Sequence, residues 1–353
     1  METQENLHSK KLTFSNTCPV PDWMPEQKKE FRKNADVYFK KLLRSTPLFE
    51  NEDLVVSYFQ QGVGSIVAKI ELSSGDVYVV KMTETPTRTI AEIKAYEAMS
   101  DNDIRVPKVY FEGTVDEHPF LVMEYFDQGT LKDAFEEEKL TLKEVGEVKS
   151  EVFVALQKIQ GKGYGWPTDY DGEFIVGNFA DIDSFMDKWF CNPDTVEIAN
   201  KYEPSISWGD ELRKHSEIIK KQYPEDESNL GSFDFQTAHF FASDPPTFFD
   251  ANPRLEPEYF DLGYLLMPSV SPNPDDIEMS KMILEKIENT SGQIDREKLL
   301  RAVWLQTFRK ATNLLLRPNE ERIKNGGHML KMLTDEGLLE KYLEQYFQSS
   351  NPA

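Results

Sequence analysis

The pattern of apolar and polar positions between residues 54 and 126 is typical of β-strands joined by tight turns. Five apolar, β-rich runs occur, at 54–59, 66–72, 77–82, 107–111 and 120–126. Short turns with glycine separate the first three, which favours hairpins and predicts an antiparallel meander. Helical spacing at 87–99 follows the third run, so one helix is expected within a five-stranded antiparallel sheet.

Helical spacing dominates from residue 131 onward and also occurs near the N-terminus. Apolar residues recur at helical intervals over the stretches 25–44, 148–159, 182–189, 211–222, 299–311 and 327–347. We therefore expect an α+β protein in three parts. These are a helical extension at 1–50, a sheet-rich lobe at 51–126 and a mainly α-helical lobe at 127–353.

The stretch from Ser232 to Asp250 contains the strongest candidate chemistry, because Asp234 and Asp250 lie near its two ends. Two short β-like runs at 239–241 and 247–249 flank a turn with two prolines, which suits a tight reversal. Carboxylates at opposite ends of a small hairpin can converge on one point, as a Mg²⁺-nucleotide enzyme requires. The pattern alone is equally compatible with two loop acids in an acidic chain.

Lys81 ends an otherwise apolar strand, where a buried ammonium group needs an acidic partner. Glu92 lies on the expected helix at 87–99 and can meet Lys81, whereas Glu97 falls off that face. This pairing would direct the lysine toward nucleotide phosphates. The alternative is an exposed lysine at the end of a strand.

A turn with two glycines precedes the second strand and contains Gly62, Gly64 and Ser65. Glycine lets the backbone approach a phosphate group closely, so this turn is a candidate phosphate-binding loop. An ordinary hairpin turn would have the same composition.

Composition narrows the class of partner. The 353 residues suffice for two domains, and the formal net charge of −22 argues against nucleic-acid or anionic-membrane partners. The charge is compatible with a cationic ligand. Two cysteines cannot support a disulfide framework, and no apolar leader or membrane-length run is present, so a cytoplasmic protein is expected. Both a monomer and a homodimer fit the sequence.

The order of these parts resembles the aminoglycoside phosphotransferase family over roughly residues 50–320. The segments that carry the resemblance are QQGVGSIVAKIELSSGDVYVVKM, AEIKAYEAMS, VPKVYFEG, FLVMEYFDQGTL, LQKIQGKGYGWP and FFDANPRLEPEYFDLGYLL. The resemblance implies a bilobal protein-kinase-like fold, with a five-stranded antiparallel N-lobe and a mainly α-helical C-lobe. It also implies Mg²⁺ and either ATP or GTP as cofactors.

The resemblance implies nucleotide-binding roles for residues of the N-lobe. Lys81 matches the lysine that binds the α- and β-phosphates, and Glu92 matches its glutamate partner. Met123 matches the gatekeeper, next to a hinge where the backbone of Glu124 and Phe126 would bond the base.

In the C-lobe, the resemblance implies that Asp234 handles the proton of the acceptor hydroxyl and that Asp250 binds the metal. It makes Asp261 a structural aspartate that braces the catalytic loop. The acceptor would be a small molecule with a hydroxyl group.

Three departures fall in the catalytic loop, where the family pattern is His-Gly-Asp-Leu-x-x-x-x-Asn. Here Ser232 replaces the histidine, Phe233 the glycine and His239 the asparagine. His239 could bind the metal, bond a metal-bound water or orient Asp234. It could equally pack on its aromatic neighbours and bind nothing.

The leading functional hypothesis is a kinase that transfers the γ-phosphoryl group of ATP or GTP to an antibiotic of the aminoglycoside type. A metabolite kinase for an amino alcohol or a sugar is the alternative enzyme. The altered loop also allows a nucleotide-binding pseudokinase without transfer activity. A protein kinase is disfavoured, because the segment between Asp250 and Asp261 is too short for a regulatory activation segment.

Overall fold

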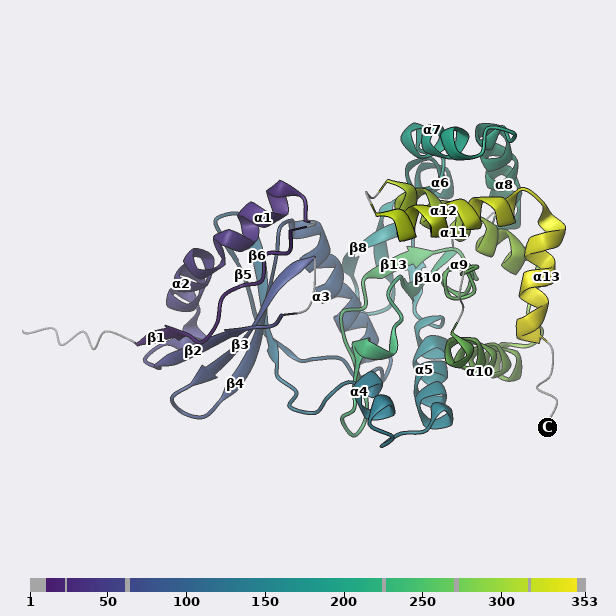
Figure 1. Ribbon diagram of the computed structural model, residues 1–353. Helices are drawn as coiled ribbons and strands as arrows, with labels where there is room; N and C mark the ends of the chain where they lie inside the picture. Colours follow the sequence, from purple (N-terminus) through teal and green to yellow (C-terminus); the bar gives the residue numbers. More distant parts are fainter. Residues whose placement is uncertain are drawn as a thin grey trace, which may run out of the picture. The chain divides into compact units, whose positions relative to one another are not determined.

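The computed structural model describes residues 11–22, 24–60, 64–223, 227–269, 273–316 and 319–347. The chain divides into two compact units (Figure 1). The first consists of Met1–Ile93 and Val106–Asp127, and the second of Lys94–Arg105 and Gln128–Ala353. None of the helices in these described ranges is long and apolar enough to cross a membrane.

The first unit is built on a six-stranded sheet with the order β1-β2-β3-β4-β6-β5. Its strands are β1 (Leu12–Phe14), β2 (Leu54–Tyr58), β3 (Ser65–Leu72), β4 (Val77–Thr83), β5 (Val109–Val115) and β6 (His118–Glu124). Buried and partly exposed residues alternate along β3, as expected when one face of a sheet covers a core. Helix α3 (Pro86–Asp101) follows β4, and the division between the units falls within it.

The predicted five-stranded antiparallel sheet requires a correction, because β1 adds a sixth strand parallel to β2. The strand is too short to show periodicity in the sequence. Contacts distant in sequence hold it, including the ring of Phe14 stacked on that of Tyr58 with centroids 6.0 Å apart. The Ser15 amide also donates to the Val56 carbonyl at 2.9 Å.

Two helices cover one face of this sheet, α1 (Glu26–Lys33) and α2 (Ala35–Ser45), followed by the short 3₁₀ helix η1 (Pro47–Phe49) (Figure 1). The sequence pattern predicted one helix there, but the backbone turns at Asn34 between them. Phe39, Leu42 and Phe49 are fully buried in the core that the helices share with the sheet. Residues expected to form an extension thus belong to the compact first unit.

The second unit combines a small closed barrel with helices. The barrel strands are β7 (Gln160–Lys162), β8 (Tyr164–Tyr170), β9 (Ile175–Phe179), β10 (Glu227–Ser232) and β13 (Pro253–Glu256). Between β10 and β13 lie the 3₁₀ helix η2 (Thr237–His239) and a hairpin of β11 (Phe240–Phe241) and β12 (Thr247–Phe248). The prediction of a mainly helical part did not include this barrel.

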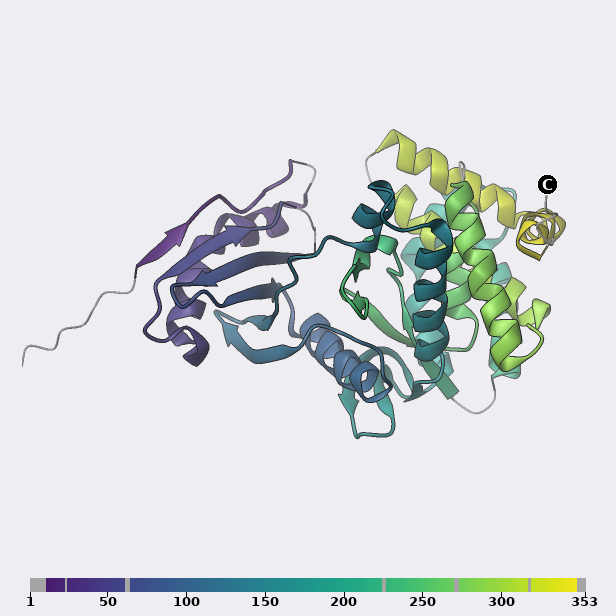
Figure 2. The same ribbon diagram turned by 90° about the horizontal axis from the view of Figure 1, so that it is seen from below.

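The helices of the second unit are α4 (Leu131–Glu136), α5 (Leu142–Leu156), α6 (Ile182–Trp189), α7 (Pro193–Tyr202), α8 (Trp208–Gln222), α9 (Phe260–Leu265), α10 (Pro274–Ser291), α11 (Arg296–Leu315), α12 (Glu320–Leu333) and α13 (Glu336–Phe347). Helices α5 and α10 lie side by side (Figures 1 and 2). The predicted start of α11 at an Asp295 cap is confirmed, since its side chain accepts from the amides of Glu297 and Lys298. The single helix predicted at 327–347 is wrong, because α12 ends at Leu333.

Candidate active site

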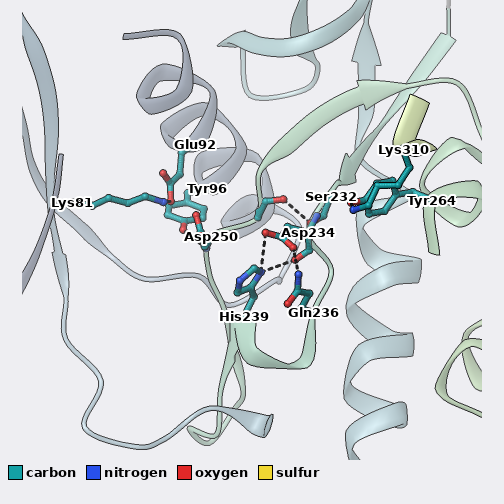
Figure 3. A network of polar contacts seen from close by, with 11 residues as sticks. Lys81, Glu92, Tyr96, Ser232, Asp234, Gln236, His239, Asp250, Tyr264 and Lys310 are labelled. Carbon is teal, nitrogen blue, oxygen red and sulfur yellow. Dashed lines mark hydrogen bonds and ion pairs between the residues drawn. The ribbon is translucent and has the colours of Figure 1, made fainter. Parts of the chain in front are cut away.

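The loop after β10 presents Asp234, the predicted catalytic carboxylate, in a half-buried position (Figure 3). Its Oδ1 accepts a hydrogen bond from the side-chain amide of Gln236. Its Oδ2 lies 3.9 Å from His239 Nδ1, which is beyond hydrogen-bond distance. Among the described residues, Oδ2 therefore has no hydrogen-bond partner.

The surroundings of Asp234 raise the pKa of its carboxyl group. Burial is the largest cause, and the neighbouring Asp250 carboxylate acts in the same direction. His239, Gln236 and Lys310 partly offset the rise. A raised pKa makes a carboxylate a better proton acceptor, which is the property that general-base catalysis uses.

His239 lies at the end of η2, with its ring turned toward the Asp234 backbone (Figure 3). Its Nδ1 is 2.6 Å from the carbonyl oxygen of Asp234. A carbonyl oxygen can only accept, so Nδ1 carries the hydrogen, and in the neutral ring Nε2 holds the lone pair. Nε2 has no hydrogen-bond partner among the described residues. This contact joins His239 to the backbone of Asp234, and Nε2 is chemically able to act as a ligand. The roles of His239 in orienting Asp234 and in binding a metal stay predictions.

Asp250 follows strand β12 and has a positive φ of 50°, which is uncommon for a residue other than glycine. Its amide donates to the hydroxyl oxygen of Tyr96 at 3.1 Å (Figure 3). The two β-like runs predicted on either side of the turn do pair, as β11 with β12. Stacked rings of Phe241 and Phe249, with centroids 4.0 Å apart, extend that pairing toward Asp250.

Asp261 on α9 braces the loop that carries Asp234 through a hydrogen bond, as predicted. Its Oδ2 accepts the Ser232 amide at 2.8 Å, and both residues are buried. Gly231 permits this approach, since a Cβ atom there would lie 2.2 Å from the Asp261 carboxylate. The bond fixes the start of the loop two residues before Asp234.

The two loop departures at Ser232 and Phe233 have structural partners. The Ser232 hydroxyl donates to the Ala251 carbonyl at 2.5 Å and so ties the loop to the segment after Asp250. Phe233 is buried, with its ring stacked on Trp189 and edge-on to Tyr264. The larger side chain thus fills space in the second unit instead of pointing into solvent.

In the first unit, Lys81 and Glu92 are brought together as predicted (Figure 3). The Lys81 ammonium donates to Glu92 Oε1 at 2.7 Å, and both side chains are about nine-tenths buried. The rival acid Glu97 instead pairs with Lys94. The ion pair exists, whereas its role in phosphate binding stays a prediction.

The predicted hinge begins at the end of β6, where Met123 is buried. The amide of Glu124 donates to the Lys108 carbonyl at 2.9 Å. A hydrogen bond from this residue to a nucleotide base would therefore have to use the Glu124 carbonyl. Phe126 is buried two residues further on.

The glycine turn is only partly described, because Gly62 lies outside the described residues. Gly64 precedes Ser65, the first residue of β3. A Cβ atom on Gly64 would lie 2.5 Å from the guanidinium of Arg88. Arg88 is an exposed cation beside the predicted phosphate loop, and neither motif nor periodicity marks it in the sequence.

The donor set fits a magnesium ion held mainly by a nucleotide. The described residues contain no group of three or more His, Cys, Asp or Glu side chains placed to bind a metal on their own. Mg²⁺ in kinases uses one or two carboxylates, with phosphate oxygens and water completing its shell. Asp250 would supply such a carboxylate, and His239 Nε2 would add a nitrogen, which Mg²⁺ favours less than oxygen.

Two cavities meet at Asp234 and both lie within the second unit. One, of about 690 Å³, extends toward α5 and α10. The other, of about 340 Å³, lies against α11. Asp234, Gln236 and Tyr264 line both, so the predicted catalytic carboxylate is accessible to a small molecule from either side.

Comparisons with known proteins agree with this arrangement. The family model for fructosamine kinase matches residues 55–193. A thermostable mutant of the aminoglycoside phosphotransferase APH(4)-Ia has a similar structure, with a TM-score of 0.55 and 12% identity over 81% of this chain and 94% of that one. A GDP complex of an aminoglycoside 2'-phosphotransferase of type IIIa gives a TM-score of 0.54 and 13% identity over 84% and 97%. No curated protein matches the sequence significantly.

The chain therefore has the protein-kinase-like fold of small-molecule phosphotransferases, and the predicted resemblance to that group is confirmed. At such low identities, the structural likeness establishes the fold and not the acceptor. The prediction of a phosphotransferase acting on hydroxyl groups agrees with both kinds of match.

Proposed function

We propose that this protein is a small-molecule kinase that transfers the γ-phosphoryl group of ATP or GTP to a hydroxyl group of a small acceptor. One observation carries the proposal: a braced, half-buried carboxylate with a raised pKa, Asp234, stands where two cavities meet. The acceptor hydroxyl would give its proton to Oδ2, while Gln236 holds Oδ1 in place.

The remaining residues position the nucleotide. Lys81, fixed by Glu92, would bind its phosphates, and the hinge backbone at Glu124 and Phe126 would bind its base. Asp250 and His239 would hold Mg²⁺, which neutralises charge on the phosphates when bound. Because phosphoryl transfer needs little covalent help from the protein, these placements supply most of the catalysis.

The choice of acceptor rests on the comparisons with known proteins. The aminoglycoside phosphotransferase neighbours support an antibiotic acceptor, and the fructosamine kinase match supports one derived from a sugar. A phosphorylation screen with ATP and GTP against both groups, read by mass spectrometry, would choose between them.

Asp234→Asn tests the mechanism, because it removes the proton acceptor but preserves the shape of the side chain. We expect transfer to fall by about 10²–10⁴-fold, the usual contribution of a general base. Nucleotide affinity, measured by calorimetry, should stay within about twofold, since Asp234 is not placed among the nucleotide ligands. The matched control is Asp244→Asn, which removes an exposed carboxylate from the nearby hairpin turn. Unchanged transfer in Asp234→Asn would refute the assignment.

A pseudokinase is the second candidate, because Ser232, Phe233 and His239 replace the family's histidine, glycine and asparagine. It predicts nucleotide binding without phosphorylation of any acceptor. The same screen, run beside calorimetry, separates it from the enzyme.

A further inference from the structure

The smaller cavity at Asp234 has a lining that differs sharply from the rest of this acidic chain. Helix α11 contributes Gln306, Arg309, Lys310, Asn313 and Leu314, which follow one another at helical spacing and so lie on one face. Among the described residues that line it, Asp234 is the only carboxylate, against two cations. The chain as a whole has 62 acidic and 40 basic residues.

Lys310 is the cation that is available to contact a ligand in this cavity. Its Nζ donates to the Tyr264 hydroxyl at 3.0 Å, and no ion pair holds it among the described residues (Figure 3). An ammonium group has three donors, so donors remain beyond the bond to Tyr264. The other cation, Arg309, is differently placed: it is partly buried, lies over the ring of Phe233 and faces Glu256 at 3.9 Å.

Amide groups supply the remaining polar surface. The side chains of Asn252 and Asn313 make no hydrogen bonds to other described residues, and each amide offers both donors and acceptors. Such groups match the hydroxyls of a sugar or polyol, which also donate and accept. The volume of about 340 Å³ is at the small end for ligand pockets, which suits an acceptor of roughly one ring.

We propose that the cavity between the Asp234 loop and α11 is the acceptor site, and that it selects a monosaccharide-sized polyol bearing a negatively charged group, with Lys310 as the ligand of that group. This inference rests on the proposed function. It replaces the cationic acceptor that the net charge alone favours, because the local charge at the reacting carboxylate has the opposite sign from that of the whole surface. A polycation would place its ammonium groups against Lys310.

Three sugars of one skeleton provide the test: glucuronate, glucose and glucosamine, with kanamycin as a polycation. For the wild type, we expect binding and kcat/KM to follow the order glucuronate, glucose, glucosamine, with at least about a tenfold span from one charge contact. Lys310→Glu should reverse the order. Lys310→Gln, which retains a donor for Tyr264, should abolish the preference without loss of folding.

Lys324→Glu, a charge reversal at an exposed position of α12, is the control and should keep the wild-type order. A wild-type preference for glucosamine or kanamycin overturns the inference, as does an order that Lys310→Glu leaves unchanged. If no probe binds, the inference also fails. Binding in the expected order without any transfer would instead support the acceptor site and refute the proposed kinase activity, so the two failures are distinguishable.

Discussion

The buried carboxyl group of Asp261 supports the loop of Asp234, and a single substitution tests that support. Burial raises the pKa of Asp261 from 3.8 to about 7, while the Ser232 amide and the charge of Arg254 act against the rise. Asp261→Asn retains an oxygen that can accept from Ser232 but has no proton to lose. Comparing the stability of the wild type with that of Asp261→Asn at several pH values therefore separates the effect of ionisation from that of the hydrogen bond.

The direction of the effect follows from proton linkage. The native pKa of Asp261 lies above the unfolded value, so between about pH 4 and pH 7 the native state binds more protons, and stability falls as pH rises. At 1.36 kcal/mol per pKa unit, the wild type should lose about 2–3 kcal/mol between pH 5 and pH 8 through this group. Asp261→Asn should lose none of it. Burial raises the pKa of Glu256 to about 8, and the Asp261 charge acts in the same direction. Glu256 titrates in both proteins, and the loss of its coupling to Asp261 is part of the difference between them.

Urea unfolding followed by tryptophan fluorescence is a suitable assay. Four of the five tryptophans lie in the second unit, so the signal reports mainly the unit that contains Asp261. The stability of Asp261→Asn relative to wild type should rise by about 2–3 kcal/mol from pH 5 to pH 8. Asp187→Asn controls for the loss of an exposed acid in the same unit. A difference between wild type and Asp261→Asn that stays constant across this range would refute the reasoning.

Two further substitutions test the remaining site residues. Glu92→Ala leaves the buried Lys81 ammonium without its 2.7 Å partner and should destabilise the first unit by about 3–5 kcal/mol, measured by calorimetric unfolding. The double variant Lys81→Met/Glu92→Leu should recover most of that stability yet lose nucleotide affinity; equal instability of both variants would contradict the estimate. If His239 binds the metal as proposed, His239→Asn replaces a nitrogen ligand by an oxygen and should lower the ratio of kcat/KM with Mn²⁺ to that with Mg²⁺. An unchanged ratio would exclude His239 from the metal site.

The sequence predicts those parts of this protein that depend on local patterns. Strands β2 to β4 are long, apolar and bounded by turns, so their pairing follows from the chain itself. The ion pair of Lys81 and Glu92 was predictable for a related reason, since a lysine on an apolar strand needs a partner and the adjacent helix offers one. Helix α11 was visible from its apolar stripe and its Asp295 cap.

Features set by contacts distant in sequence could not be predicted in the same way. Strand β1 has three residues, and its place is fixed by β2 some forty positions later. Strand β8 contains glycine, proline and an acid, and it becomes a strand because the barrel closes around it. The polar face of α11 has the pattern of a solvated surface, and only the tertiary fold turns it toward Asp234.

We infer that the altered loop is a modified working loop and not a discarded one. Each changed residue makes a contact that holds the loop: the Ser232 hydroxyl binds the Ala251 carbonyl, Phe233 packs on Trp189, and His239 Nδ1 binds the Asp234 carbonyl. Ordering a loop costs conformational entropy, roughly 1–2 kcal/mol for each backbone residue, so these contacts offset a real loss. Together they leave Oδ2 of Asp234 without a hydrogen bond among the described residues, beside two cavities. A half-buried carboxylate is more stable when it is paired with a cation. We therefore infer that Oδ2 of Asp234 is left without a hydrogen bond because it has to accept a proton.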